Sequence, residues 1–215
     1  MGRLPRLIQH IVGAYTPPVT NDRVFYLTFD DGPTGWTPLL IDLLGIWKGK
    51  ATFFWTWSKY KERIVSSILS QLWEGGHNVG LHGLTHLSGW RIRRPAEEII
   101  RARGLWRKVG VPLIPAFRAP YGHWRLSSLP EGIKLIFWDL MPADYLYGTI
   151  WLPWLLKNLR PGDVVVLHEH THNKTLWPEF FRSVVVEGWR MEALPLPGLG
   201  QESYLDELLL TARME

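Results

Sequence analysis

The stretch VFYLTFDDGP, residues 24–33, decides how the rest of this chain can fold. Its first six residues are apolar, aromatic or β-branched, as in a buried strand, and Gly32-Pro33 is a turn signal that ends the strand. Asp30 and Asp31 therefore stand where an unpaired buried carboxylate would be costly. Either they cap the turn and the next helix, or one binds a cation while the other acts as a base.

Strands and helices alternate along the chain after this point. Near-continuous apolar strands that alternate with helices are typical of an α/β fold with a mostly parallel sheet covered on both faces, open or closed into a barrel. Functional residues are then expected in the loops that follow the carboxyl ends of the strands. The predicted strands are residues 24–30, 51–55, 77–82, 114–118, 133–138 and 164–168, and the predicted helices are residues 38–47, 60–73, 95–109, 150–159 and 177–187.

Size and composition favour a single domain. The 215 residues can bury one sizeable core, and 46% hydrophobic with 20% charged residues is ordinary for a globular protein. We expect residues 1–21 to form an N-terminal segment and residues 22–215 to form the main domain. The chain has no cysteine, which excludes disulfides and thiolate metal ligands. Its thirteen tryptophans indicate an aromatic core, and such rings also stack on sugar faces.

The charge balance does not indicate a nucleic-acid partner. The 24 Lys and Arg residues exceed the 20 Asp and Glu residues by only four, and the basic residues of 101–108 share a predicted helix with Glu97 and Glu98, as on a solvated face. Residues 1–12 make a poor signal peptide because Gln9 and His10 interrupt the apolar run. No run reaches the roughly 18 apolar residues of a transmembrane segment. The missing export signal favours the cytoplasm.

Ionisable residues stand at the same end of most predicted strands. Core packing explains one or two such residues, but the repetition is typical of a functional site. We expect these side chains to converge on one rim of the sheet. They are Asp30, Asp31, His82, Arg118, Asp139 and His168.

Two histidines and one aspartate form a candidate metal site. His82 and His86 are four residues apart, so that one helical turn would bring both imidazoles to the same side. Alone, two histidines at this spacing are more often surface or core residues. With Asp31 they supply two nitrogens and one oxygen and leave positions open for water, as in a catalytic divalent-metal site. Such a site acidifies its water and polarises a carbonyl, so it suits hydrolysis.

Hydrolysis at this site requires a base and an acid. Asp30 is next to the metal-ligand candidate and is the predicted base. His168 is the predicted acid because a histidine can hold and release a proton near neutral pH, although a core histidine bonded to backbone is the alternative. Arg118 would hold Asp30 ionised by charge pairing, and Asp144 would favour the protonated form of His168.

Three blocks of sequence together resemble the polysaccharide deacetylases with a NodB-type carbohydrate esterase domain. The order and spacing of these blocks fit from about residue 22 to residue 195. The first block and the His-x-x-x-His block are together highly specific, and the arginine block adds support. The blocks are TFDDGP at 28–33, GHNVGLH at 76–82 with His86, and RAPYG at 118–122.

The resemblance implies a distorted (β/α) barrel of mostly parallel strands, with residues 22–215 as a polysaccharide-deacetylase-like catalytic domain. It implies zinc or a similar divalent ion held by Asp31, His82 and His86. It also implies a carbohydrate substrate.

The same resemblance implies roles for residues around the metal. Fixed hydrogen-bond donors count most where negative charge develops, so an oxyanion donor is physically reasonable. The implied roles are Asp30 as base, His168 as acid, Arg118 as the group that orients the base, Asp144 as the group that tunes the acid, the Tyr121 backbone N–H as an oxyanion donor, and Tyr145 and Val166 as the lining of the acetyl pocket.

The sequence departs from the pattern of the family at three places. Gly83 follows the first metal histidine, where Ser or Thr is usual, so a hydrogen bond that fixes the loop would be missing. Met141 and Tyr145 stand where the usual Asp-x-x-Asp-Trp block has its first acid and its aromatic residue. Glu169 follows the candidate acid, where Asp is usual. These changes bear on the shape of the substrate and acetyl pockets more than on the metal, since all three ligands are present.

We therefore expect a metal-dependent hydrolase that removes acetyl groups from an N-acetylated sugar polymer or glycoconjugate. An alternative is the same machinery on another acyl group, as in a deformylase or an O-acetyl esterase, because the pocket residues are those that depart. A catalytically silenced carbohydrate-binding module is a further alternative, against which the presence of both Asp30 and His168 argues. A metal buffer built from His168, His170 and His172 is disfavoured because the residues between them are typical of a loop.

Overall fold

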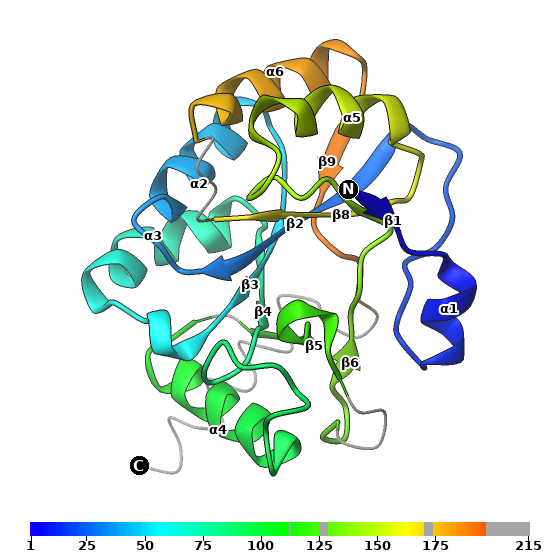
Figure 1. Ribbon diagram of the computed structural model, residues 1–215. Coiled ribbons are helices and arrows are strands. Elements are labelled where there is room, and N and C mark those ends of the chain that lie inside the picture. Colours follow the sequence, from blue (N-terminus) through cyan, green and yellow to red (C-terminus); the bar gives the residue numbers. More distant parts are fainter. Residues whose placement is uncertain (112, 125–128, 170–173, 197–215) are drawn as a thin grey trace.

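A curved, mostly parallel β-sheet forms the centre of the protein, and helices lie around its outer side (Figure 1). The computed structural model describes residues 1–111, 113–124, 129–169 and 174–196. The strands in these residues are β1 (Gly2–Arg3), β2 (Val24–Gly32), β3 (Thr52–Trp55), β4 (Asn78–Leu81), β5 (Leu113–Phe117), β6 (Lys134–Leu135), β7 (Leu140–Met141), β8 (Val164–His168) and β9 (Arg190–Glu192). The helices are α1 (Arg6–Ile11), α2 (Thr37–Ile46), α3 (Glu62–Glu74), α4 (Pro95–Lys108), α5 (Trp151–Asn158) and α6 (Trp177–Val186).

The strand order is β1-β7-β8-β2-β3-β4-β5-β6, and β9 pairs with β2 beside this path. Paired strands run parallel except β1 and β7, which are antiparallel. In the described part of the chain no ladder joins β6 to β7, and Tyr15 instead forms a single bridge with Ile136 beside β6. The predicted α/β fold, a distorted barrel of mostly parallel strands in a single domain, is confirmed.

The core explains why the central strand is apolar throughout. Phe25, Leu27 and Phe29 of β2 are fully buried, and Phe29 stacks on Phe53 of β3 with ring centroids 5.4 Å apart. Burial of each such side chain contributes about 1.5–3 kcal/mol to folding. On the helical side Trp106 of α4 is also fully buried. Its truncation to alanine would cost about 3–5 kcal/mol because the neighbouring side chains cannot fill the space.

The five predicted helices correspond to α2 through α6, with ends that differ by two residues at most. The prediction for residues 133–138 is wrong in extent, because only Lys134–Leu135 pairs as a strand there. The short elements β1, α1, β7 and β9 were not predicted because their apolar runs are too brief to show a period. Within the described residues, none of the helices combines the length and hydrophobicity that a membrane crossing requires.

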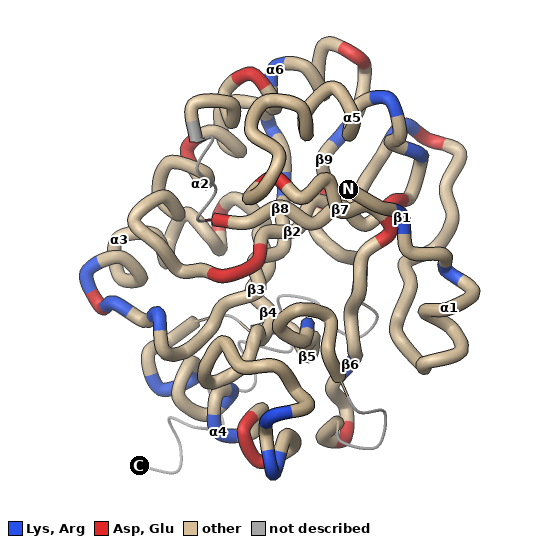
Figure 2. Tube along the Cα trace, in the orientation of Figure 1, with Lys and Arg blue, Asp and Glu red and all other residues tan. Residues whose placement is uncertain are grey.

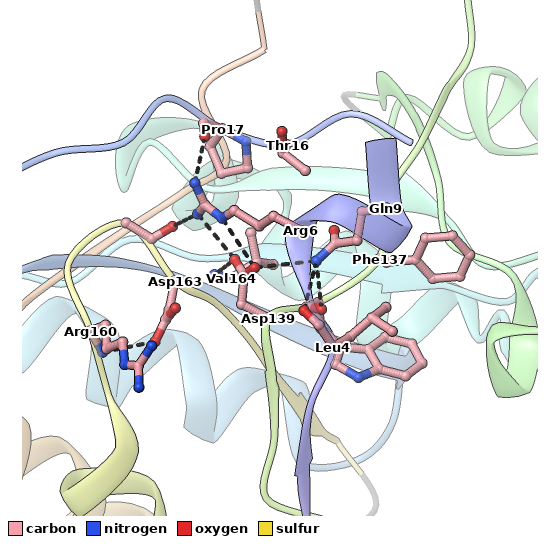
Figure 3. Close-up of polar contacts among 12 residues, drawn as sticks. Leu4, Arg6, Gln9, Thr16, Pro17, Phe137, Asp139, Arg160, Asp163 and Val164 are labelled. Atoms are coloured by element: carbon pink, nitrogen blue, oxygen red, sulfur yellow. Dashed lines mark hydrogen bonds and ion pairs between the residues drawn. The ribbon is translucent and has the colours of Figure 1, made fainter. Parts of the chain in front are cut away.

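The N-terminal residues are tied to the barrel by a buried carboxylate (Figure 3). Asp139 accepts hydrogen bonds from Arg6 Nε and Nη2, both at 3.1 Å, from Gln9 Nε2 at 3.2 Å and from the Val164 amide at 2.9 Å. Asp139 was expected at the functional rim, and that expectation is wrong. It precedes β7 and contacts the first residue of β8, so it lies at the amino ends of these strands, where it joins the N-terminal segment to them.

Candidate metal and catalytic site

The carboxyl ends of β2, β4, β5 and β8 bring the predicted site residues together. Asp30 is paired in register with His168 of β8 and with Phe54 of β3, which places the strand ends at one level. A cavity of about 470 Å³ opens at this rim. Figure 2 shows the acidic end of β2 inside the ring of helices, whereas many Lys and Arg residues lie on outer elements such as α3 and α4. The residues that line the cavity include Asp30, Asp31, His82, His86 and His168, and also Lys59, Trp138 and Met141.

Asp31, His82 and His86 form one cluster of ligand atoms. Asp31 Oδ1 lies 2.7 Å from His86 Nε2 and 3.4 Å from His82 Nε2. One atom from each residue lies within 4.8 Å of the other two, which is the spacing that a single divalent ion can bridge. His82 Nδ1 lies 2.8 Å from the Arg118 carbonyl, to which it can donate, so the Nε2 lone pair is directed to the cluster. The donor set therefore fits a divalent metal.

The backbone around Asp31 is held in an unusual conformation. Asp31 has a φ of 70°, in the left-handed region that few residues other than glycine adopt. Lys59 Nζ donates to the Asp31 carbonyl at 2.8 Å and stabilises this turn. Burial alone would raise the pKa of Asp31, but the contacts with His82 and His86 lower it well below its usual range. The carboxylate is thus ionised, as a metal ligand must be.

Asp30 is paired with a fully buried arginine. Arg118 Nη1 donates to Asp30 Oδ1 at 2.8 Å and to Thr28 Oγ1 at 2.6 Å, and Nη2 donates to the Phe137 carbonyl at 2.8 Å. The guanidinium carbon also lies 4.2 Å from the ring centre of Phe54. Burial lowers the pKa of Arg118, and the charge of Asp30 opposes that shift. These contacts fix the orientation of the Asp30 carboxylate beside the ligand cluster.

His168 is held by two contacts with Asp144. His168 Nδ1 lies 2.8 Å from Asp144 Oδ1, and the His168 amide donates to Asp144 Oδ2 at 3.0 Å. Burial alone would lower the pKa of His168, but the hydrogen bond to Asp144 and the charges of Asp144, Asp30 and Asp31 raise it. Tyr145 contacts the imidazole side-on, with ring centroids 4.7 Å apart. His168 is therefore favoured as the imidazolium, and Nε2 is its remaining N–H.

Comparison with known proteins agrees with this geometry. The sequence model of the family described as polysaccharide deacetylase matches residues 18–134. The chain belongs to the polysaccharide deacetylase family. It is 30% identical over 156 residues to a chitooligosaccharide deacetylase of Sinorhizobium fredii, covering 67% of this chain and 71% of that protein. It is 27% identical over 167 residues to a peptidoglycan-N-acetylglucosamine deacetylase of Bacillus cereus, covering 72% of this chain and 76% of that protein.

A solved structure shows the same fold. The peptidoglycan deacetylase PdaC from Bacillus subtilis matches with a TM-score of 0.71 and 23% sequence identity, covering 90% of this chain and 94% of that one. This member of the polysaccharide deacetylase family therefore has the same barrel fold as that solved structure.

The loop that carries both histidines differs from the prediction. Residues 82–86 are not helical, so the expected helical turn is wrong. The two imidazoles still meet because Glu98 of α4 holds the loop, with Oε1 accepting from the amides of Leu84 at 3.0 Å and Thr85 at 3.1 Å. Gly83 has a φ of +95°, which only glycine adopts without strain. The family usually has Ser or Thr at the position of Gly83, and in this member of the family Glu98 holds the loop instead.

The residue after His168 supports the loop that carries the two aspartates. Glu169 is fully buried, and its carboxylate accepts hydrogen bonds from Trp55 Nε1 at 2.8 Å and from the Thr37 hydroxyl. Its amide donates to the Asp30 carbonyl at 3.1 Å. A Cβ atom at Gly32 would overlap the Glu169 carboxylate. Burial raises the pKa of Glu169 to about 7, with partial opposition from these hydrogen bonds.

The remaining predicted pocket residues also line the cavity. Tyr121, Tyr145 and Val166 all contribute to its wall. The backbone at Tyr121 is left-handed, with a φ of 60°, at the turn that follows Arg118. Lys59 could not be predicted as a site residue, because a lone lysine after a strand is ordinary. Trp138 could not be predicted either, since its only signal is its place after an apolar run. His170 and His172 lie outside the described residues.

Proposed function

We propose that this protein is a metal-dependent hydrolase that removes acetyl groups from N-acetylated sugars of a glycan. The observation that carries the proposal is that Asp30 and His168 line the cavity that holds the ligand cluster, and that each forms a buried ion pair, Asp30 with Arg118 and His168 with Asp144. Relatives named chitooligosaccharide deacetylase and peptidoglycan-N-acetylglucosamine deacetylase support an N-acetylated glycan as the substrate.

Asp31, His82 and His86 are the residues that would hold the metal, and zinc is the ion that we propose. Two imidazoles and one carboxylate suit zinc and leave further positions open. When bound there, a divalent ion supplies Lewis-acid polarisation of the acetyl carbonyl and lowers the pKa of water.

Asp30 and His168 then divide the proton transfers between them. Asp30 accepts a proton from the water that attacks the acetyl carbonyl carbon, and Arg118 keeps the carboxylate turned toward that water. His168 donates its Nε2 proton to the amide nitrogen as the C–N bond breaks. The products are acetate and a free amino sugar. Asp144 holds His168 in the tautomer and orientation that this donation requires.

The wall of the cavity would bind the acetyl group. We assign the Tyr121 backbone N–H to the oxyanion, because a fixed donor stabilises the charge that develops on the carbonyl oxygen. Tyr145 and Val166 would contact the acetyl methyl group. Trp138 lines the same cavity and adds an apolar surface that the sequence did not predict.

The test is metal analysis combined with acetate release from N-acetylglucosamine oligomers. We expect His82→Ala to lose zinc and activity together, and Asp30→Ala to keep zinc while its turnover falls. Asp42→Ala is the matched control, because Asp42 is exposed on α2. Full acetate release from Asp30→Ala would remove the base assignment. Zinc-loaded parent protein that binds the oligomers without releasing acetate would favour the silenced binding module.

A further inference from the structure

A smaller cavity, here called the α1 cavity, lies beside the candidate active site. It has a volume of about 250 Å³. Tyr121, Gly122 and Trp138 line both this cavity and the catalytic one, so the two are neighbours. A substrate group that extends from the catalytic cavity past Trp138 can therefore enter the α1 cavity. The other residues of its wall are Leu4, Ile8, Gln9, Val12 and Phe137.

The wall of the α1 cavity is mostly apolar. Leu4, Ile8 and Val12 recur at every fourth residue and all face the cavity. The rings of Phe137 and Trp138, with centroids 6.0 Å apart, contribute aromatic surface to the same wall. The hydroxyl groups of a sugar would lose water there without gaining enough partners, whereas a hydrocarbon group would lose nothing. The cavity therefore suits a hydrocarbon ligand.

The helix that forms this wall is packed with its polar side inward. Of the six described residues of α1 only Gln9 is buried, whereas Leu7, Ile8 and Ile11 are 71%, 47% and 73% exposed. A surface helix of a globular protein ordinarily buries its apolar residues instead. Gln9 Nε2 donates to two backbone carbonyls, at 3.1 and 3.3 Å, and to Asp139 Oδ1 at 3.2 Å (Figure 3). Polar contacts thus hold the helix, and Ile8 stays accessible at the cavity.

The α1 cavity is small, and its shape is fixed by the fold. Its volume lies below the roughly 300–1,000 Å³ of pockets for drug-sized ligands, so it suits a single narrow chain. Asp139 accepts from Arg6 of α1 and from the Val164 amide of β8, which holds the helix against the sheet. A cavity that is formed in advance binds without the entropic cost of ordering its wall.

We propose that the α1 cavity binds the hydrocarbon chain of a glycolipid whose N-acetylated sugar lies in the catalytic cavity. This inference rests on the proposed function, and it names a substrate class for it. Each methylene group that leaves water in the cavity adds to affinity. The helix α1 precedes residues 18–134, which the sequence model of the family matches, so this part of the wall belongs to the N-terminal segment of this chain.

The test compares deacetylation of the methyl and decyl glycosides of N-acetylglucosamine, the latter below its critical micelle concentration. We expect the parent to have a higher kcat/KM for the decyl glycoside. A triethylene glycol glycoside should gain nothing over the methyl glycoside, because a polar chain loses hydration in an apolar cavity. In Ile8→Ser the advantage of the decyl chain should fall by about tenfold, which corresponds to about 1.4 kcal/mol, and Ile8→Leu should retain most of it.

Ile11→Ser is the matched control, because Ile11 is exposed on the same helix but does not line the α1 cavity. This variant should keep the advantage of the decyl chain. A loss in Ile11→Ser equal to that in Ile8→Ser would overturn the proposal, since the exposed face of α1 would then contact a lipid surface or a second copy of the chain. A loss in Ile8→Ser that is equal on the methyl and decyl glycosides would also overturn it.

Calorimetric binding of the two glycosides separates failure of the chain site from failure of the proposed function. Parent protein that binds the decyl glycoside more tightly than the methyl glycoside, through Ile8, but releases no acetate would keep the chain site and overturn the deacetylase. Parent protein that releases acetate from N-acetylglucosamine oligomers but gains nothing from the decyl chain would keep the deacetylase and overturn the chain site.

Discussion

Both carboxylate oxygens of Asp144 contact His168, one at the imidazole Nδ1 at 2.8 Å and one at the backbone amide at 3.0 Å. A single side chain thus fixes the position of the ring and favours its charged form. Contacts of this kind lead to one prediction on the candidate acid, one on the loop of the metal ligands and two on Gly32 and Glu169.

Asp144→Asn should move the pH dependence of activity. Asp144 helps to raise the pKa of His168, so its neutralisation lowers that pKa. A general acid must be protonated, and the decline of kcat/KM on the alkaline side should therefore begin at a lower pH than in the parent. The measurement is the pH profile of acetate release, with Asp42→Asn as the control. An unchanged alkaline limb would argue against His168 as the acid.

Glu98→Ala should weaken metal binding without touching a ligand. Glu98 holds the amides of Leu84 and Thr85, between the two histidines. Loss of a residue that orients metal ligands lowers affinity by about 10–100-fold. Zinc affinity measured by competition with a chelator tests this prediction. Glu97→Ala is the matched control, because Glu97 lies on the same turn of α4 and, among the described residues, pairs only with exposed Arg94. Equal zinc affinity in both variants would contradict the prediction.

Gly32→Ala should destabilise the fold by about 1–3 kcal/mol, because the added methyl group overlaps a packed side chain. That side chain is Glu169, and the methyl group would also overlap the Trp55 indole. Gly35→Ala is the control, since a Cβ atom there meets nothing within 4 Å. Urea unfolding gives the free energies. If the overlap is the cause, shortening the partner in Gly32→Ala/Glu169→Asp should restore part of the loss, and simple additivity of the two changes would speak against it.

Glu169→Gln should flatten the pH dependence of stability. The pKa of Glu169 is raised from 4.5 to about 7 in the folded protein, so between these values the folded state holds a proton that the unfolded state has lost. Stability contributed by this group is therefore present below about pH 4.5 and declines as pH rises toward 7. The free energy of unfolding, measured by urea titration across that window, should fall less in Glu169→Gln than in the parent. Parallel curves would show that Glu169 titrates normally.

Most residues of the rim could be predicted from the sequence because the geometry of a parallel sheet determines where they lie. Carboxyl ends of neighbouring parallel strands meet at one side of a sheet, so Asp30, His82, Arg118 and His168 could be brought together without knowledge of the fold in detail. Their proximity is now seen, and their catalytic roles stay predictions. Asp139 failed the same rule because the strand before it stops pairing at Leu135, and the Asp139 carboxylate instead accepts from the amide of Val164, the first residue of β8.

Other features depended on contacts between residues far apart in the chain. The histidine pair was expected on a helical turn, since spacing of four suggests one, but the loop is instead shaped by a carboxylate from α4. Glu98 was interpreted as part of a solvated face because the charges around it in the sequence are mixed. Lys59 gave no signal, because its partner is a backbone carbonyl of Asp31 and backbone partners leave no pattern in the sequence.

The short first strand has a consequence for solubility. β7 pairs with β8 on one side, and among the described strands it meets only β1 on the other side, through Gly2–Met141 and Arg3–Leu140. An uncovered strand edge offers its free amides and carbonyls to a second molecule and promotes aggregation. The ion pair between Arg6 and Asp139 holds the two-residue strand β1 in place against β7. Removal of the first residues should therefore make the protein aggregate sooner, before it alters any rate of turnover.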